Sequence, residues 1–266
     1  MRGSKSSPNP ACSPPPGWSR TIGTVRYLVI GDSITNPGLS ADERPWSALL
    51  PPLLEARGVT PVDLEAFLFW PVGQRSAAYA LKRADDYQPD VVLVVLNAYP
   101  CVVKLVSERV RRLFGAKAHR WFTRAEHTLQ ARAAARPGRA GRTTRLAKRA
   151  ARRTIGATGV ASASEVSRVY CEVLHGLARL EGVAVYVLGA ARFGSTIREA
   201  NPAIEKDIDS FQAPMRRAAW EHRMPFIDLE PVIRQEGDAA WMPDHVHLSP
   251  LGNRIYAATI AAAVAP

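Results

Sequence analysis

The chain has 266 residues, of which 47% are hydrophobic, so it is long enough for one large domain or two small ones with a buried core. No run approaches ~18 uninterrupted apolar residues, which argues against a membrane-spanning helix. The three cysteines, Cys12, Cys101 and Cys171, match neither a zinc-binding spacing nor a disulfide framework. The net charge of +11 is concentrated in residues 104–153, which carry 16 Lys and Arg against 2 Glu, while the rest of the chain is close to neutral.

Apolar runs bounded by turn residues predict strands, and periodic stretches with capping signals predict helices between them. The predicted strands are Thr24–Ile30, Val62–Trp70, Val91–Leu96, Val183–Leu188 and Phe226–Leu229. The predicted helices are Arg44–Arg57, a helix from a capping box at Ser162 and Glu165 to about Glu181, Ala203–His222, and Pro250–Ala263. The pair Pro51-Pro52 could split the first of these helices, and Pro214 could bend the third.

Strands that alternate with helices imply βαβ units and a mostly parallel sheet. The continuously apolar run Val91–Leu96 suits a central strand that is covered on both faces. Ligands bind beyond the carboxyl ends of such strands, and Ser33, Gly73, Asn97 and the loop after Gly189 all follow predicted strands. We therefore expect the functional site at that edge of the sheet.

Residues 1–22 are rich in Ser and Pro and lack the apolar centre of a secretory signal, so we interpret them as a disordered leader. Residues 23–266 then form one domain, interrupted at about 104–155 by a basic insertion. A cytoplasmic location is the default expectation, with peripheral attachment to a membrane through the basic insertion as a variant.

Part of the basic insertion has helical periodicity. Ala118, Trp121, Phe122, Ala125 and Leu129 recur at helical spacing and predict an amphipathic helix. A stripe of this kind more often packs against a core than against lipid. Further along, the sequence TTRLAKRAARR is typical of either a short basic helix or a disordered arm.

A segment with this charge attracts polyanions. An acidic protein or an anionic membrane would fit it as a partner. No recognised nucleic-acid-binding motif accompanies the charge, which argues against sequence-specific binding of nucleic acid. The alternative is a solvated insertion that has no partner.

Residues near the two ends of the chain are candidates for a catalytic site. Ser33 follows the first predicted strand within Gly31-Asp32-Ser33, and a serine hydroxyl needs a general base within hydrogen-bond reach to act as a nucleophile. Near the C-terminus, PDHVHLSPLG offers His247 as the base and Asp244, three residues earlier, as its orienting partner. This order along the chain is workable, because catalytic triads are defined by geometry rather than by sequence position.

These two blocks resemble the SGNH, or GDSL-type, hydrolase family. Gly-Asp-Ser directly after the first strand and Asp-x-x-His-Leu-Ser-Pro near the end carry the resemblance, and RPWSALL and PFIDL are similar to the family's connecting segments. The resemblance spans about Val25–Ala263, the basic insertion excepted. Gly-Asp-Ser alone is a weak signal, whereas the two blocks in these positions are a strong one.

The resemblance implies a flavodoxin-like three-layer α/β sandwich and hydrolysis of an ester or thioester without a metal or cofactor. It gives Ser33 the role of nucleophile, His247 that of base and Asp244 that of orienting residue, while Asp32 is expected to be structural. It also implies an oxyanion hole made of the Ser33 N–H, the N–H of a glycine after the second strand, for which Gly73 fits, and an asparagine side chain after the third strand.

The third block departs from the family's pattern of Gly-x-Asn-Asp, because this chain has LNAYP. Counted without a gap from Pro89-Asp90, the family's asparagine position falls on Tyr99, whereas a two-residue shortening places Asn97 there. We favour Asn97, because it supplies an amide donor and Tyr99 could donate only its hydroxyl.

Three functions therefore compete. The first is hydrolysis of a small-molecule or carrier-bound acyl ester or thioester, and the second is acyl transfer through the same acyl-serine intermediate. The third is a binding protein that has lost activity and uses its basic insertion, which the altered third block would explain. Arg75 and Arg192, on loops at the same edge, are better explained as solvated surface arginines than by contact with an anionic substrate.

Overall fold

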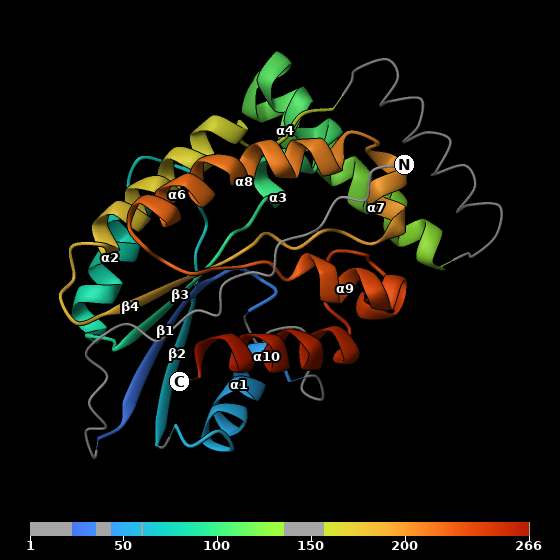
Figure 1. Cartoon of the computed structure of the whole chain (residues 1–266). Coiled ribbons are helices and arrows are strands. Elements are labelled where there is room, and N and C mark those ends of the chain that lie inside the picture. Colours follow the sequence, from blue (N-terminus) through green and yellow to red (C-terminus); the bar gives the residue numbers. More distant parts are fainter. Residues whose placement is uncertain (1–22, 36–43, 60, 136–156, 266) are drawn as a thin grey trace, which may run out of the picture.

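The computed structural model describes residues 23–35, 44–59, 61–135 and 157–265. Its centre is a sheet in the order β2-β1-β3-β4-β5, in which every neighbouring pair is parallel (Figure 1). The strands are β1 (Val25–Gly31), β2 (Val62–Leu68), β3 (Val91–Val95), β4 (Ala184–Leu188) and β5 (Phe226–Ile227). The winding reverses between β1 and β3, and open α/β sheets bind ligands beside such a reversal.

Strand β3 is the centre of the molecule. Each of its residues is buried, because it pairs with β1 on one side and with β4 on the other while helices cover both faces. The expected mostly parallel sheet with a central strand at Val91–Leu96 is therefore confirmed, one residue shorter at its carboxyl end.

Helices on both faces of the sheet give three layers (Figure 1). Tyr27 and Val29 of β1 point into one core layer, and Leu28 and Ile30 point into the other, as the alternation of a strand requires. The first layer is covered by α1 (Trp46–Glu55), α9 (Glu230–Glu236) and α10 (Pro250–Val264). The second is covered by α2 (Ser76–Tyr87), α3 (Tyr99–Val102), α6 (Ala163–Leu177) and α8 (Ile204–Glu221).

Two helices begin at side-chain caps. The Ser162 hydroxyl accepts the N–H of Glu165, and the Glu165 carboxylate accepts the N–H of Ser162 at 2.7 Å, so the predicted capping box is present. At α10 the Ser249 hydroxyl accepts the N–H of Gly252 at 3.2 Å, with Pro250 at the first helical position. The capping residue Ser249 lies two residues after His247, so the cap fixes the end of that loop.

Some boundaries differ from the prediction. Pro51-Pro52 does not split α1, which is one continuous helix held against α10 by buried Leu50 and Leu54. Pro214 likewise lies inside a single α8. Strand β5 covers only the first half of Phe226–Leu229, because the Asp228 carboxylate accepts the N–H of Glu230 at 3.1 Å and the chain turns there into α9.

Other elements differ at their ends or had no sequence prediction. The helix from Ser162 ends at Leu177 rather than near Glu181, and β2 ends at Leu68 rather than Trp70. The unpredicted elements are α2, α3, α7 (Ser195–Ala200), α9 and the short 3-10 helix η1 (Gly237–Ala240).

The basic insertion opens as α4 (Val106–Ala135), which confirms a helix over the predicted stretch. Trp121 in that helix is 74% exposed, so the expectation that the stripe packs against a core is wrong for this residue. The stretch TTRLAKRAARR and the leader 1–22 lie outside the described residues. Within the described ranges, no helix has the length and apolar character needed to cross a membrane.

Candidate active site

Ser33 lies in a tight turn that follows β1 directly. A side chain at Gly31 would collide with that of Thr35, so the turn needs glycine there. The N–H of Thr35 donates to the Asp32 carbonyl at 3.0 Å, and the N–H of Ile34 donates to the Asp32 carboxylate at 2.9 Å. Asp32 and Thr35 are buried while Ser33 between them is exposed, so the turn presents the Ser33 hydroxyl outward.

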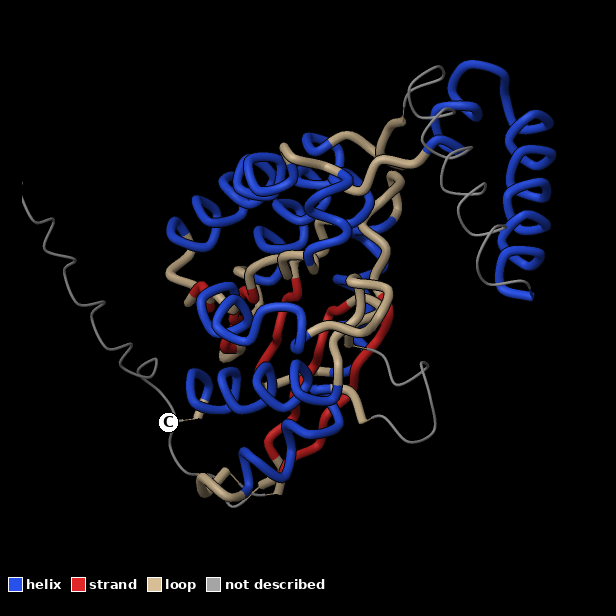
Figure 2. The backbone as a smooth tube through the Cα atoms, turned by 90° about the vertical axis from the view of Figure 1, so that its right-hand side faces the viewer, coloured by secondary structure: helices blue, strands red, loops and turns tan. Residues whose placement is uncertain are grey.

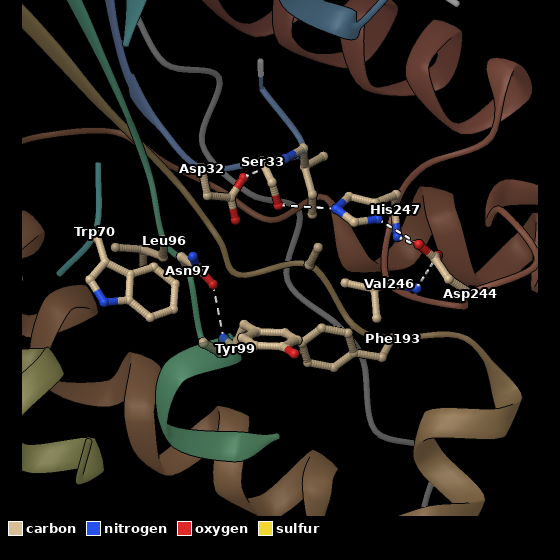
Figure 3. Close-up of a pocket in the computed structure, with 13 residues that line it drawn as sticks. Asp32, Ser33, Trp70, Leu96, Asn97, Tyr99, Phe193, Asp244, Val246 and His247 are labelled. Carbon is tan, nitrogen blue, oxygen red and sulfur yellow. Dashed lines mark hydrogen bonds and ion pairs between the residues drawn. The ribbon is translucent and has the colours of Figure 1, made fainter. Parts of the chain in front are cut away.

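The three residues expected to form a triad are in hydrogen-bond contact (Figure 3). The Ser33 Oγ lies 3.1 Å from Nε2 of His247, and Nδ1 of the same imidazole lies 2.6 Å from Oδ2 of Asp244. When Nδ1–H donates to the carboxylate, Nε2 is left as an acceptor for the serine hydroxyl. This is the arrangement that a nucleophile, a base and an orienting carboxylate require.

The second oxygen of Asp244 holds the carboxylate in place. Its Oδ1 accepts the N–H of Val246 at 2.9 Å and the N–H of His247 at 3.0 Å. Burial opposes ionisation of Asp244, but these bonds and the adjacent imidazole outweigh it and hold the pKa of this carboxyl below its usual range. Asp244 is therefore ionised near neutral pH and can stabilise a protonated His247.

The pKa of the Asp32 carboxyl is shifted in the opposite direction from that of Asp244. Its burial raises the pKa of the carboxyl to about 6, although the backbone N–H of Ile34 stabilises the ionised form. Its contact with the Ile34 N–H agrees with the structural role expected from sequence, since the carboxylate holds the turn that carries Ser33.

Asn97 lies across the pocket from Ser33 and is fixed by its neighbours (Figure 3). Its backbone N–H donates to the Tyr170 hydroxyl at 2.8 Å, and that hydroxyl donates to the Val95 carbonyl at 3.0 Å. Its side-chain Oδ1 accepts the N–H of Tyr99 at 2.9 Å. With Oδ1 occupied in this way, the Nδ2 group is the part of the amide left to donate to a ligand.

Tyr99, the alternative oxyanion donor, also lines the pocket. Its ring packs edge-on against Phe193 at 6.4 Å between centroids. Burial, and then the nearby negative charge of Asp244, raise the pKa of the Tyr99 hydroxyl. Both candidates therefore reach the pocket, Asn97 with an amide and Tyr99 with a neutral phenol.

Gly73 is not among the residues that line the pocket. It is exposed in the loop after β2 and has a φ of 108°, a conformation that favours glycine. Gly73 thus occupies a turn whose backbone conformation suits glycine. That its N–H contributes to an oxyanion hole stays a prediction.

The pocket beside Ser33 has a volume of about 320 Å³. Its walls are mostly apolar and aromatic, from the loops after β2, β3 and β4 and from the His247 loop: Trp70, Leu96, Ala98, Tyr99, Ala191, Phe193 and Val246. Of these side chains, only Tyr99 was a candidate from the sequence. The others carried no signal beyond their place at the end of a predicted strand, in the loop after one, or within PDHVHLSPLG.

A glycine supports the loop that carries Asp244 and His247. Gly194 donates its N–H to the His245 carbonyl at 3.0 Å, and a Cβ on Gly194 would lie 2.8 Å from the Cβ of His245. His245 itself has a φ of 57°, so the chain turns sharply between the two triad residues. His245 faces Asp238, with Nδ1 3.6 Å from Oδ1, rather than Ser33.

Arg192 does not serve as a free anion-binding group. Its guanidinium pairs with the carboxylates of Glu205, Asp209 and Glu230, and its side chain is only 14% exposed. It ties the loop after β4 to α8 and α9.

Among the described residues, no group of three or more His, Cys, Asp or Glu could hold a metal ion.

No protein-family model and no curated protein matches the sequence. Solved structures do match. The acetyl xylan esterase AlAXEase matches with a TM-score of 0.53 and 18% identity, over 90% of this chain and 100% of that one. An α/β hydrolase enzyme from the metagenome of Lake Arreo, Spain, matches with a TM-score of 0.53 and 17% identity, over 90% and 94%. The protein TesA matches with a TM-score of 0.53 and 14% identity, over 90% and 97%.

These matches confirm the fold that the resemblance implies. The chain has the SGNH-type α/β hydrolase fold, with a five-stranded parallel sheet and helices on both faces. Esterases are among its structural neighbours.

Proposed function

We propose that this protein is a serine hydrolase that cleaves an ester or thioester through an acyl-Ser33 intermediate. The observation that carries the proposal is the continuous hydrogen-bonded chain from Ser33 through His247 to Asp244 at the wall of an apolar pocket. The esterases among the structural neighbours support it.

In the first half-reaction, Ser33 Oγ attacks the acyl carbon and its proton passes to His247 Nε2. The carbonyl π electrons move to oxygen, so a tetrahedral oxyanion forms. When it collapses, the bond to the leaving oxygen or sulfur breaks, and that atom takes the proton from His247. In the second half-reaction a water molecule gives a proton to His247 and attacks the acyl carbon, which forms a second tetrahedral oxyanion. When this collapses, the bond to Ser33 Oγ breaks, Oγ takes the proton from His247, and the acid is released.

Two donors of this chain suit the oxyanion. The Ser33 N–H makes no hydrogen bond to any other described residue, and Asn97 Nδ2 is presented by the contact of its Oδ1 with the Tyr99 N–H. Donors that are fixed before the reaction stabilise charge without reorganising, and the loss of one typically costs ~10²–10³ in rate.

The pocket walls favour an uncharged acyl group. Trp70, Tyr99 and Phe193 line it, and the carboxylates at its edge are Asp32 in the Ser33 turn and Asp244 beside His247. A negatively charged substrate would meet these carboxylates, whereas an aliphatic or aromatic acyl group would bury its surface against the rings.

The test is turnover of a short activated ester and the matching thioester. We expect Ser33→Ala and His247→Ala each to lower kcat by roughly 10⁴-fold or more, and the double variant to be scarcely worse, because triad residues act as a unit. Ser164→Ala and His175→Ala, the same changes at exposed positions of α6, serve as controls and should leave kcat unchanged. Substantial turnover by purified, folded Ser33→Ala would contradict the assignment.

A further inference from the structure

Helix α4 is little covered by the rest of the molecule: among its residues 106–125, only Val110 is buried. Figure 2 shows it standing away from the body of the molecule in two pieces. The pieces meet at Gly115, whose φ of 80° and ψ of −179° are essentially restricted to glycine. This break turns the second piece, which begins at residue 116, in a new direction.

The second piece presents a basic stripe that contains an aromatic residue. Lys117, Arg120, Trp121 and Arg124 follow the i, i+3, i+4, i+7 spacing of one helix face, and all four are exposed. Trp121 is 74% exposed. Ala118, Phe122 and Ala125, on a different face, are half-buried.

The end of the first piece adds more apolar surface. Phe114 is 65% exposed and Leu113 is 51% exposed, next to Arg111 and Arg112. Leu113 and Phe114 before the break, and Trp121 after it, are therefore large apolar side chains exposed on α4 in a stretch rich in arginine. Exposed apolar clusters with a polar surround mark interaction sites more often than solvated surface.

The charge of the stripe is not neutralised by the rest of the described chain. Lys117, Arg120 and Arg124 make no ion pair with any described residue. On the first piece of the helix, Glu108 is already engaged by Arg111 at 2.6 Å and faces His119 at 3.5 Å. The stripe is thus free to meet an external anion.

We propose that the exposed face of α4, made of Leu113, Phe114, Lys117, Arg120, Trp121 and Arg124, docks on an anionic lipid bilayer. Tryptophan and phenylalanine beside lysine and arginine suit the water–lipid boundary, where the rings enter the acyl region and the cations meet headgroups. An acidic protein would account for the cations, but it would not require Trp121 and Phe114 to be exposed to solvent.

Docking at α4 would hold the pocket close to the bilayer. Helix α3 carries the pocket residue Tyr99, and only residues 103–105 separate it from α4. Within that short link, Lys104 binds Asp207 of α8 at 3.0 Å, which anchors the base of α4 to the body. The docking itself does not depend on the proposed hydrolysis, because it involves none of the triad residues.

The test is co-sedimentation of the full chain with vesicles. One set contains phosphatidylcholine alone and the other phosphatidylcholine mixed with phosphatidylglycerol, each at low and high salt. The charge variant is Lys117→Gln with Arg120→Gln and Arg124→Gln, and the aromatic variant is Phe114→Ser with Trp121→Ser. The control is Trp220→Ser, which removes a tryptophan that is 83% exposed on α8, outside the docking face.

We expect the unaltered protein to bind the anionic vesicles and not the neutral ones. Each basic side chain at an anionic surface strengthens binding roughly fivefold, so the charge variant should bind on the order of 100-fold more weakly at low salt. The aromatic variant should lose about tenfold or more at either salt concentration, because apolar burial is not screened. Trp220→Ser should bind as the unaltered protein does.

Three results would overturn the proposal. Failure of the unaltered protein to bind anionic vesicles would exclude the bilayer. Full binding by the aromatic variant with loss in the charge variant would assign the stripe to an acidic protein instead. A dimer in sedimentation velocity that the aromatic variant abolishes would assign the face to a second copy of the chain. Circular dichroism and thermal unfolding of each variant establish that it is folded.

Discussion

Asn97 is held so that, of its side-chain amide, the Nδ2 group is the part left to bind a ligand. Its backbone and its Oδ1 are both engaged, through Tyr170 and through the N–H of Tyr99. Tyr99 has a half-buried hydroxyl whose pKa is raised, first by burial and then by the charge of Asp244, so it stays a neutral phenol. At the scale of single residues, this difference favours Asn97 over Tyr99 as the oxyanion donor.

We expect Asn97→Asp to lower kcat by ~10²–10³ while KM changes little, because the aspartate keeps the acceptor for the Tyr99 N–H but removes the donor. Tyr99→Phe should leave kcat within a few-fold, since it removes only a hydroxyl. Steady-state kinetics on the short ester measures both. A larger loss of kcat in Tyr99→Phe than in Asn97→Asp would reverse the assignment.

Because Asp32 is buried, we expect the free energy of unfolding to depend on pH. Burial raises the pKa of this carboxyl from 3.8 to about 6 in the folded state, so the folded protein binds the proton more tightly than the unfolded chain does. Stability from this group is therefore complete below about pH 4 and is lost as the pH rises to about 6, by on the order of 3 kcal/mol.

Asp32→Asn should remove that loss, because asparagine does not titrate and its side-chain oxygen can still accept the Ile34 N–H. The free energy of unfolding from urea titrations at several pH values between 4 and 7 measures it, and the variant should gain on the original protein as the pH rises. Asp86→Asn, which removes an exposed carboxylate paired with Lys82, is the control. A constant difference between Asp32→Asn and the original protein would contradict the prediction.

At the scale of elements, the loop that carries Asp244 and His247 rests on the loop after β4. The contact is close because Gly194 has no side chain, and His245 reaches it by adopting a left-handed backbone. The loop is also tied at its far end, where Ser249 caps α10. The position of His247 is thus set by two neighbouring elements.

Gly194→Ala should lower kcat by about tenfold or more, although alanine suits the backbone of this residue, because the new Cβ would push the His245 side chain and its loop away from Ser33. His245→Gly in the same chain should restore most of kcat, since it removes the colliding group and glycine suits a φ of 57°. Steady-state kinetics of the two single variants and the double variant measures the coupling. Equal activity of Gly194→Ala and the original protein would show that the loop does not position His247.

The elements also explain which features were predictable from sequence. The central strand β3 and the capping box at Ser162 are local patterns, and both are present. Ser33 and His247 were identified by short motifs in which the neighbouring residues shape the turn, as Asp32 and Asp244 do here.

Other features depend on contacts that no local pattern encodes. Trp70 and Phe193 reach the pocket from separate loops, and no motif pointed to either residue. The spacing of Ala118, Trp121, Phe122 and Ala125 in α4 is typical of a buried face, yet Trp121 is 74% exposed, in the piece of the helix that follows the break at Gly115. The short helices α3, α7 and α9 have too few residues to show a helical period.

At the scale of the whole molecule, the sheet brings together residues from both ends of the chain. Ser33 and His247 are 214 positions apart, and they meet because β1 lies beside the central strand β3 while α10 packs across α1. The reactivity of Ser33 should therefore depend on the fold as much as on the residue itself. A serine hydroxyl without a base at hydrogen-bond distance is a poor nucleophile.

The most direct measurement is covalent labelling of the intact protein by a fluorophosphonate, with the modified residue located by mass spectrometry. We expect one adduct, on Ser33, in the native protein, and none after unfolding in urea or in His247→Ala. Absence of an adduct on Ser33 in the folded protein, or an equal yield in folded His247→Ala, would contradict the claim that Ser33 is a nucleophile activated by His247.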